Sequence, residues 1–119
     1  MLFKGTQRRT AQGVAREVDS VGGLINGFTS REISCYFIKI LAEKLPMAVD
    51  LLGDMICHSR FNPEDIEKER RVILQEIAMI EDSPEDLVHD QFTHAFWAGH
   101  PLGMPVIGTR STVESVDRQ

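Results

Sequence analysis

The segment from Asn62 to Asp82, NPEDIEKERRVILQEIAMIED, constrains the fold most, because it predicts one long helix. Asn62 is a favourable N-cap, and Pro63 suits the first helical position. The acidic residues that follow suit the positive end of the helix dipole. At 100° per residue the apolar side chains fall on one face, which predicts the buried side of the helix. These side chains are Ile66, Val72, Ile73, Ile77, Met79 and Ile80.

Two carboxylates fall within that apolar face. With Glu69 at zero on the helical wheel, Glu76 lies at about 340°, two turns further along and about 10 Å away. A buried carboxylate is costly unless a partner compensates its charge. One interpretation places both at the edge of the apolar face, bonded to arginine or backbone groups. The other makes at least one of them a metal ligand or a general base.

Composition limits the class of protein. The chain has 119 residues, 42% apolar and 26% charged, which is typical of one small globular domain. A net charge of −5 without a Lys/Arg run argues against a nucleic-acid partner. No apolar run is long enough for a membrane span, and no signal peptide is visible. Cys35 and Cys57 lack metal-site spacing, which favours buried, reduced thiols and a cytoplasmic location.

Signals for helices and strands alternate along the rest of the chain. Strands are expected at 24–29 and 33–41, joined by Ser30-Arg31-Glu32 into an antiparallel hairpin. The pair Asn26-Gly27 also fits a two-residue turn, but that turn would leave a first strand too short to pair well. Helices are expected at 10–21, 45–59, 63–82 and 83–98, and a last one starts near Ser111. Thr10 and Ser83 are the predicted N-caps of the first and the fourth helix.

These elements give an α+β fold with antiparallel strands packed against helices. Two strands are a small sheet for four helices, which suggests a fragment of a larger domain or a piece that completes its sheet through a partner. Apolar periodicity predicts the buried side of each helix. The expected inward residues are Ala11, Val14, Ala15 and Val18 in the first helix, Ala48, Leu51, Leu52, Met55 and Ile56 in the second, and Val88, Phe92, Ala95 and Phe96 in the fourth.

A second acidic set lies on the helix at 83–98. Asp86, Asp90 and His94 recur every four residues and share one face. Carboxylates and imidazole can together bind a divalent metal. The same face lies opposite the apolar stripe, so an ordinary solvated surface is the other interpretation. Motifs for a serine or cysteine nucleophile and for a phosphate-binding loop are absent from the sequence.

Six sequence blocks, in their order along the chain, resemble the pitrilysin/insulinase family of zinc peptidases. Within that family they look most like the bacterial relatives of the mitochondrial processing peptidase. The blocks are MLFKGT-x-x-RTA at 1–11, EVDSVGGLINGFTSRE at 17–32, CYFIKIL at 35–41, FNPEDIEKERRVILQEI at 61–77, EDSPEDLVHDQF at 81–92 and HPLGMPVIGT at 100–109.

The resemblance implies a zinc site that uses the two carboxylates of the long helix. The family's inverted motif H-x-x-E-H lies immediately before the MLFKGT block and is absent from this chain. Glu76 matches the family's third zinc ligand, and Glu69 matches its supporting acidic residue. Asn26, Gly27, Phe28 and Thr29 match the edge strand that pairs with the peptide substrate, with Gly27 in place of the usual alanine. Met104 replaces an arginine that many relatives carry.

The resemblance also implies a partial domain. Residues 1–119 would form a single truncated N-terminal-type peptidase domain of processing-peptidase (LuxS/metallohydrolase-like) fold, without the H-x-x-E-H helix and the C-terminal part. The complete protein is then expected to be a zinc metalloendopeptidase, while this chain alone neither cleaves peptides nor holds zinc. The alternative is a non-catalytic interaction module of a peptidase assembly. Expected partners are peptide substrate, a second copy or a second peptidase chain, but neither nucleic acid nor a membrane.

Overall fold

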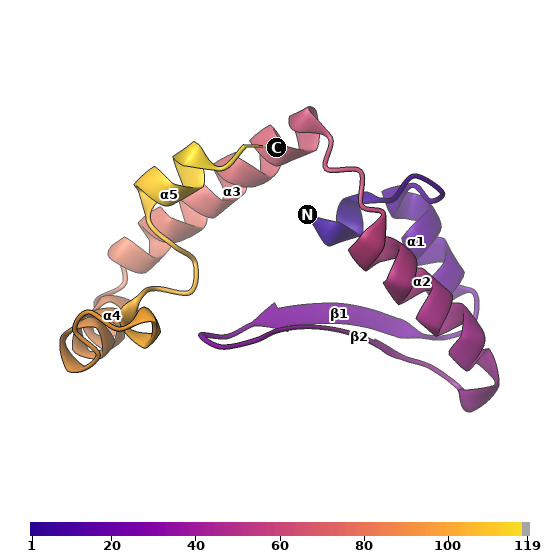
Figure 1. The fold of residues 1–119 in the computed structure, drawn as a ribbon, viewed down its shortest axis with the longest axis horizontal. Coiled ribbons are helices and arrows are strands. Elements are labelled where there is room, and N and C mark those ends of the chain that lie inside the picture. The colour runs from indigo at the N-terminus through magenta and orange to yellow at the C-terminus, as the bar shows by residue number, and fades with distance from the viewer. Residues whose placement is uncertain (118–119) are drawn as a thin grey trace. The chain divides into compact units, whose positions relative to one another are not determined.

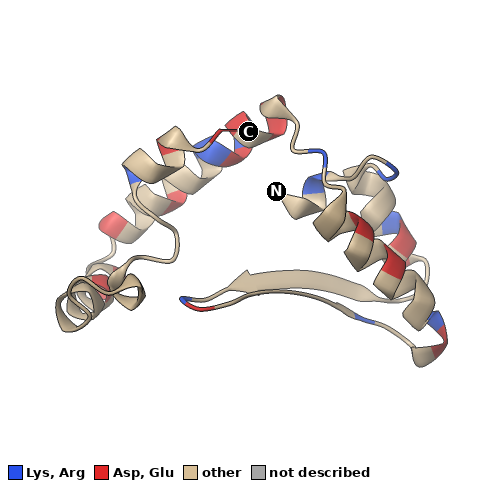
Figure 2. Cartoon of the chain, in the orientation of Figure 1, with Lys and Arg blue, Asp and Glu red and all other residues tan. Residues whose placement is uncertain are grey.

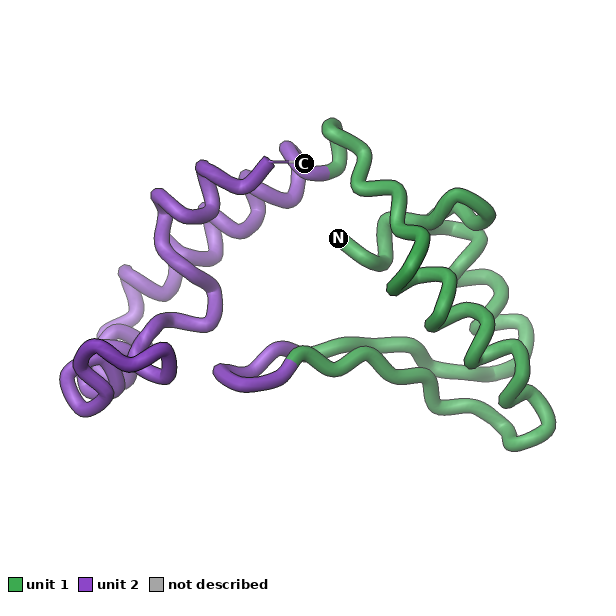
Figure 3. Tube along the Cα trace, viewed as in Figure 1, with its two compact units in different colours: residues 1–28, 34–65 green, residues 29–33, 66–119 purple. Residues whose placement is uncertain are grey.

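The computed structural model describes residues 1–117, which fall into two compact units (Figures 1 and 3). The first unit contains residues 1–28 and 34–65, and the second contains residues 29–33 and the chain from 66 onward. In chain order the elements are η1 (Leu2–Lys4), α1 (Ala11–Asp19), β1 (Leu24–Thr29), β2 (Ser34–Lys39), η2 (Ala42–Lys44), α2 (Leu45–Cys57), α3 (Pro63–Glu81), α4 (Pro84–Phe96), η3 (Pro101–Gly103) and α5 (Arg110–Ser115), where η marks a short 3-10 helix.

The expected hairpin is present. β1 and β2 form a two-stranded antiparallel sheet, and Asn26-Gly27 lies inside β1 rather than at a turn. The actual turn is closed where the Ser30 amide donates to the Ile33 carbonyl at 2.8 Å. β2 ends at Lys39, two residues before the predicted end. The α+β prediction is therefore confirmed.

The core of the first unit lies between α1, α2 and the hairpin. Its centre consists of Val14 and Val18 from α1 and Leu51 and Met55 from α2, all almost completely buried. The strands add Ile25 and Ile38, which alternate with exposed neighbours as expected for a sheet covered on one face. Three residues expected inward are exposed instead, namely Ala11, Ala15 and Ile56.

The helix α3 buries only part of its predicted apolar face. Ile77 is buried, and Ile73 and Ile80 are half-buried toward the loop that precedes α5. Val72 and Met79 are exposed, so the prediction for these two was wrong. They lie about 80° or more around the helix from the isoleucines. The apolar stripe is thus wider than the surface that covers it within the second unit.

The orientation predicted for α4 was also wrong. Phe92 and Phe96 expose 68% and 66% of their surface, and Val88 and Ala95 are exposed as well. The opposite side of α4 faces the rest of the second unit. The exposed side chains form an aromatic series, because the Phe92 and Phe96 rings stack at 5.9 Å and Phe96 meets Trp97 edge-on at 5.2 Å.

Two helices, α1 and α4, start with the predicted capping chemistry. The Thr10 and Ser83 side chains accept hydrogen bonds from the third residue of α1 and α4, respectively. α5 starts one residue before the predicted point and is capped by Thr109, which forms a reciprocal capping box with Thr112. At its other end the Arg70 guanidinium of α3 donates to the carbonyls of Val113, Glu114 and Val116.

Candidate functional site

Glu76 lines a pocket in the second unit. The pocket has a volume of about 590 Å³, and its walls come from α3, α4, the end of β1 and the loop before α5. Glu76 is exposed rather than buried, whereas Glu69, two turns earlier on the same helix, is half-buried. The remaining lining residues are Thr29, Ile73, Ile80, Asp86, His89, Asp90, Val106 and Ile107.

The predicted substrate strand spans the two units. Thr29 lines the pocket beside Glu76, while Asn26, Gly27 and Phe28 belong to the first unit. Phe28 exposes about half of its surface, and the Asn26 side chain accepts a hydrogen bond from the Gly27 amide at 2.8 Å. A Cβ atom at Gly27 would lie 2.8 Å from the Tyr36 ring. The glycine therefore fits the cross-strand tyrosine, and an alanine would require the ring to shift.

The acidic set on α4 is divided between different surroundings. Asp86, His89 and Asp90 line the pocket that contains Glu76, while His94 lines another one. Asp90 forms an ion pair with Arg31 at 3.2 Å. Within residues 1–117, the structure brings no three His, Cys, Asp or Glu side chains close enough together to hold a metal ion. It therefore does not assemble Asp86, Asp90 and His94 into a metal site.

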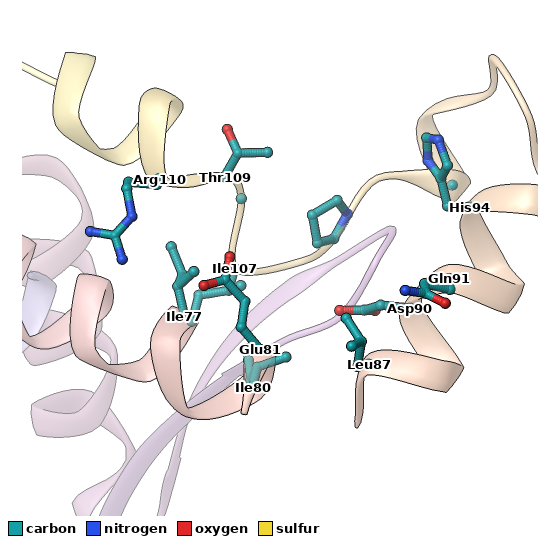
Figure 4. Close-up of a pocket in the computed structure, with 13 residues that line it drawn as sticks. Ile77, Ile80, Glu81, Leu87, Asp90, Gln91, His94, Ile107, Thr109 and Arg110 are labelled. Carbon is teal, nitrogen blue, oxygen red and sulfur yellow. The ribbon is translucent and has the colours of Figure 1, made fainter. Parts of the chain in front are cut away.

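The pocket lined by His94 is more apolar (Figure 4). It has a volume of about 350 Å³ and is walled by Ile77, Leu87 and Ile107, with Glu81 and Arg110 among its polar side chains. Sequence periodicity gave no indication of it, because the loop that closes it has no regular pattern. Ile80 and Asp90 line both pockets.

The first unit contains a buried carboxylate that the sequence analysis missed. The Asp54 side chain on α2 is fully buried and accepts hydrogen bonds from the Thr6 hydroxyl at 2.7 Å, Arg9 at 2.8 Å and Arg8 at 3.1 Å. The acidic residues of α2 are Asp50 and Asp54, and Figure 2 colours acidic residues red. The available signal was the position of Asp54, which lies three residues after the buried Leu51 and so within the apolar stripe.

This hydrogen bonding controls the protonation of Asp54. The Thr6 hydroxyl, together with the guanidinium groups of Arg9 and Arg8, holds the pKa of the Asp54 carboxyl well below its usual range, although burial acts in the opposite direction. Arg9 also bonds to Glu17 and Asp50, so one guanidinium joins α1, α2 and the segment before α1. The arrangement is structural, because no buried side-chain nitrogen or oxygen among the described residues, 1–117, lacks a hydrogen-bond partner.

The cysteine prediction was half right. Cys35 and Cys57 are both free thiols, but Cys57 is exposed at the end of α2 rather than buried, and Cys35 is half-buried.

None of the helices in residues 1–117 combines the length and the apolar character needed to cross a membrane.

The chain belongs to the insulinase family, peptidase family M16, whose sequence model matches residues 1–110. An uncharacterised zinc protease of Bacillus subtilis is 44% identical over 115 residues, which is 97% of this chain and 28% of that protein. An uncharacterised zinc protease of Streptomyces coelicolor is 45% identical over 116 residues, covering 98% of this chain and 25% of that protein. This chain thus spans about a quarter of the length of these relatives.

Solved structures show the same fold. A protease from Helicobacter pylori superimposes with a TM-score of 0.90 at 24% identity, covering 98% of this chain and 28% of that one. A peptidase M16 inactive domain from Pseudomonas fluorescens gives a TM-score of 0.89 at 13% identity, covering 98% of this chain and 29% of that one. The predicted family and fold class are therefore confirmed.

Proposed function

We propose that this chain supplies the carboxylate side of the active site of a zinc metalloendopeptidase in the bacterial cytoplasm. The supporting observation is the position of Glu76, which is exposed on the wall of a pocket that also includes Thr29 of the expected substrate strand. Glu76 is the proposed zinc ligand, and Glu69 on the same helix is its supporting residue. Family membership over residues 1–110 makes zinc the metal to test.

The residues of this chain provide only part of a zinc site, namely one carboxylate ligand. A carboxylate oxygen is an accepted zinc ligand, and catalytic zinc sites take three protein ligands and leave one position open. In the proposal, the family's H-x-x-E-H motif provides two histidines and a general base, and Glu76 provides the remaining ligand. Zinc would supply a Lewis acid that lowers the pKa of water and polarises a carbonyl. Glu69 would orient Glu76 or its neighbours through hydrogen bonds.

Peptide substrates would be held by strand addition. In this mode an extended peptide pairs with the exposed edge of a strand, so that main-chain hydrogen bonds provide affinity without reading each side chain. Asn26, Gly27, Phe28 and Thr29 of β1 are the proposed edge. The exposed Phe28 of this strand offers an apolar contact.

A chimera tests the proposal. In the chimera this chain replaces the aligned segment of the Bacillus subtilis relative, so that the remainder of the proposed site comes from that relative. We expect about one zinc per chimera and zinc-dependent cleavage of unstructured peptides, with the unmodified relative as control. The isolated 119-residue chain is expected to show neither. Absence of zinc from the chimera when the relative binds it would contradict the proposal, as would peptide cleavage by the isolated chain.

A non-catalytic interaction module is the second candidate. It is favoured by the exposed aromatic series of α4, since exposed apolar patches commonly mark protein interfaces. In this case the isolated chain should self-associate at micromolar concentration, and Phe92→Glu should return it to the monomer. Sedimentation velocity would measure both. Gln75→Glu, on an exposed residue of α3, adds the same negative charge away from the aromatic series and is the control. A monomeric wild-type chain would exclude this candidate.

A further inference from the structure

One side chain of the hairpin turn bonds to two other segments of the second unit. The Arg31 guanidinium donates hydrogen bonds to the carbonyl oxygens of Leu102 and Met104 and to a carboxylate oxygen of Asp90. Its side chain is only 27% exposed, although it lies at a turn. A single cation therefore joins the turn to η3 and to α4.

The segments that Arg31 joins are also walls of the pocket that contains Glu76. Thr29, two residues before Arg31, and Asp90 both line that pocket. Two further lining residues follow Met104 closely in the loop before α5. A movement of the turn away from Met104 would therefore change the width of the pocket.

Hydrogen bonds within the turn connect Arg31 to the end of β1. The Ser30 amide bonds to the Ile33 carbonyl at 2.8 Å, and the Ser30 hydroxyl contacts both the amide and the carbonyl of Ile33. Arg31 lies between these two residues. Fixing its guanidinium therefore fixes the end of β1, including Thr29.

We propose that Arg31 is a positioning residue of the peptidase site, which sets the spacing between the end of β1 and the wall of the pocket beside Glu76. This inference rests on the proposed function. Arginine suits the role because its planar guanidinium has five N–H donors and can satisfy two carbonyls and a carboxylate together. The positive charge of Arg31 also compensates the negative charge of Asp90. Glu76 and Asp86, the other acidic residues that line the pocket, form no ion pair with Arg31.

The first part of the test uses the 119-residue chain and measures amide hydrogen exchange. Arg31→Ala should increase exchange in peptides that cover the turn and residues 100–108, while α3 keeps its protection. Arg71→Ala is the matched control, because Arg71 is an exposed arginine of α3 in the same unit. Equal exchange in Arg31→Ala and wild type would overturn the inference.

The second part uses peptide cleavage by the chimera. Arg31→Ala is expected to raise KM about tenfold, with kcat changed less than about twofold and zinc content unchanged. Arg31→Lys, which keeps the charge and three donors, should return KM to within about threefold of wild type. An unchanged KM in Arg31→Ala would overturn the inference, and so would loss of zinc. A chimera without zinc or activity before any substitution would instead refute the proposed function, and the exchange experiment would still decide whether Arg31 holds the turn.

Discussion

Glu76→Gln in the chimera is expected to reduce bound zinc to less than about one-tenth and peptide cleavage by about 1,000-fold or more. The neutral amide keeps the size of the side chain but removes the negative charge that a zinc ligand provides. Zinc content would be measured by atomic absorption and cleavage with a quenched fluorescent peptide. Thermal stability should change little, because Glu76 is exposed and outside the packed core.

Glu81→Gln is the matched control for this substitution. Glu81 is an exposed glutamate of the same helix, but it lines the other pocket. It should retain zinc and activity. Glu69→Gln is expected to reduce peptide cleavage by about 10- to 100-fold, which is less than Glu76→Gln and more than Glu81→Gln. The reason is that a residue that orients a ligand contributes less than the ligand itself. Full zinc content in Glu76→Gln would contradict its assignment as a ligand.

Asp54→Ala in the 119-residue chain is expected to lower Tm by about 15 °C or to abolish cooperative unfolding. The substitution leaves the Thr6 hydroxyl and the Arg9 guanidinium without the acceptor they share, and it opens space beside the core residues Leu51 and Met55. Thermal unfolding followed by circular dichroism would measure the effect. Asp50→Ala provides the comparison. Because Asp50 is about half exposed, this substitution should lower Tm by only a few degrees.

The pH dependence of stability gives an independent check on Asp54. Its pKa is lower in the folded chain than the value of about 3.9 expected when unfolded. The unfolded state therefore binds the proton more readily, and the stabilisation is fully present above about pH 5 and is lost on acidification through pH 4 toward the folded pKa. Wild type should lose stability over this range, and Asp54→Ala should lose less. Parallel curves for the two proteins would refute this account.

Features that depend on local chemistry could be predicted from the sequence. The caps at Thr10 and Ser83, the proline at the start of α3 and the hairpin turn all arise from residues within a few positions of one another. The strands at 24–29 and near 34–39 also follow from local composition. Glu69 and Glu76 could be proposed as site residues for the same reason, since a helical wheel requires only one segment, and their roles stay predictions.

Features that depend on distant residues could not be predicted in this way. The bond between Thr6 and Asp54 joins positions 48 apart, and Arg31 reaches carbonyls more than 70 positions away. The predicted orientation of α4 was wrong for a related reason. Periodicity shows that Phe92 and Phe96 share a face, but which face is covered depends on the loop that packs against the helix.

The contact of Arg70 with the end of α5 determines when that helix can form. A helix of six residues is too short to persist alone in water, since nucleation costs more than so few hydrogen bonds return. Arg70 satisfies carbonyls of Val113, Glu114 and Val116 that would otherwise lack a partner in a helix of this length. α5 therefore forms by docking onto an existing α3. During unfolding α5 should be released first, and the loop that closes the pocket of Figure 4 would lose its anchor at the same step.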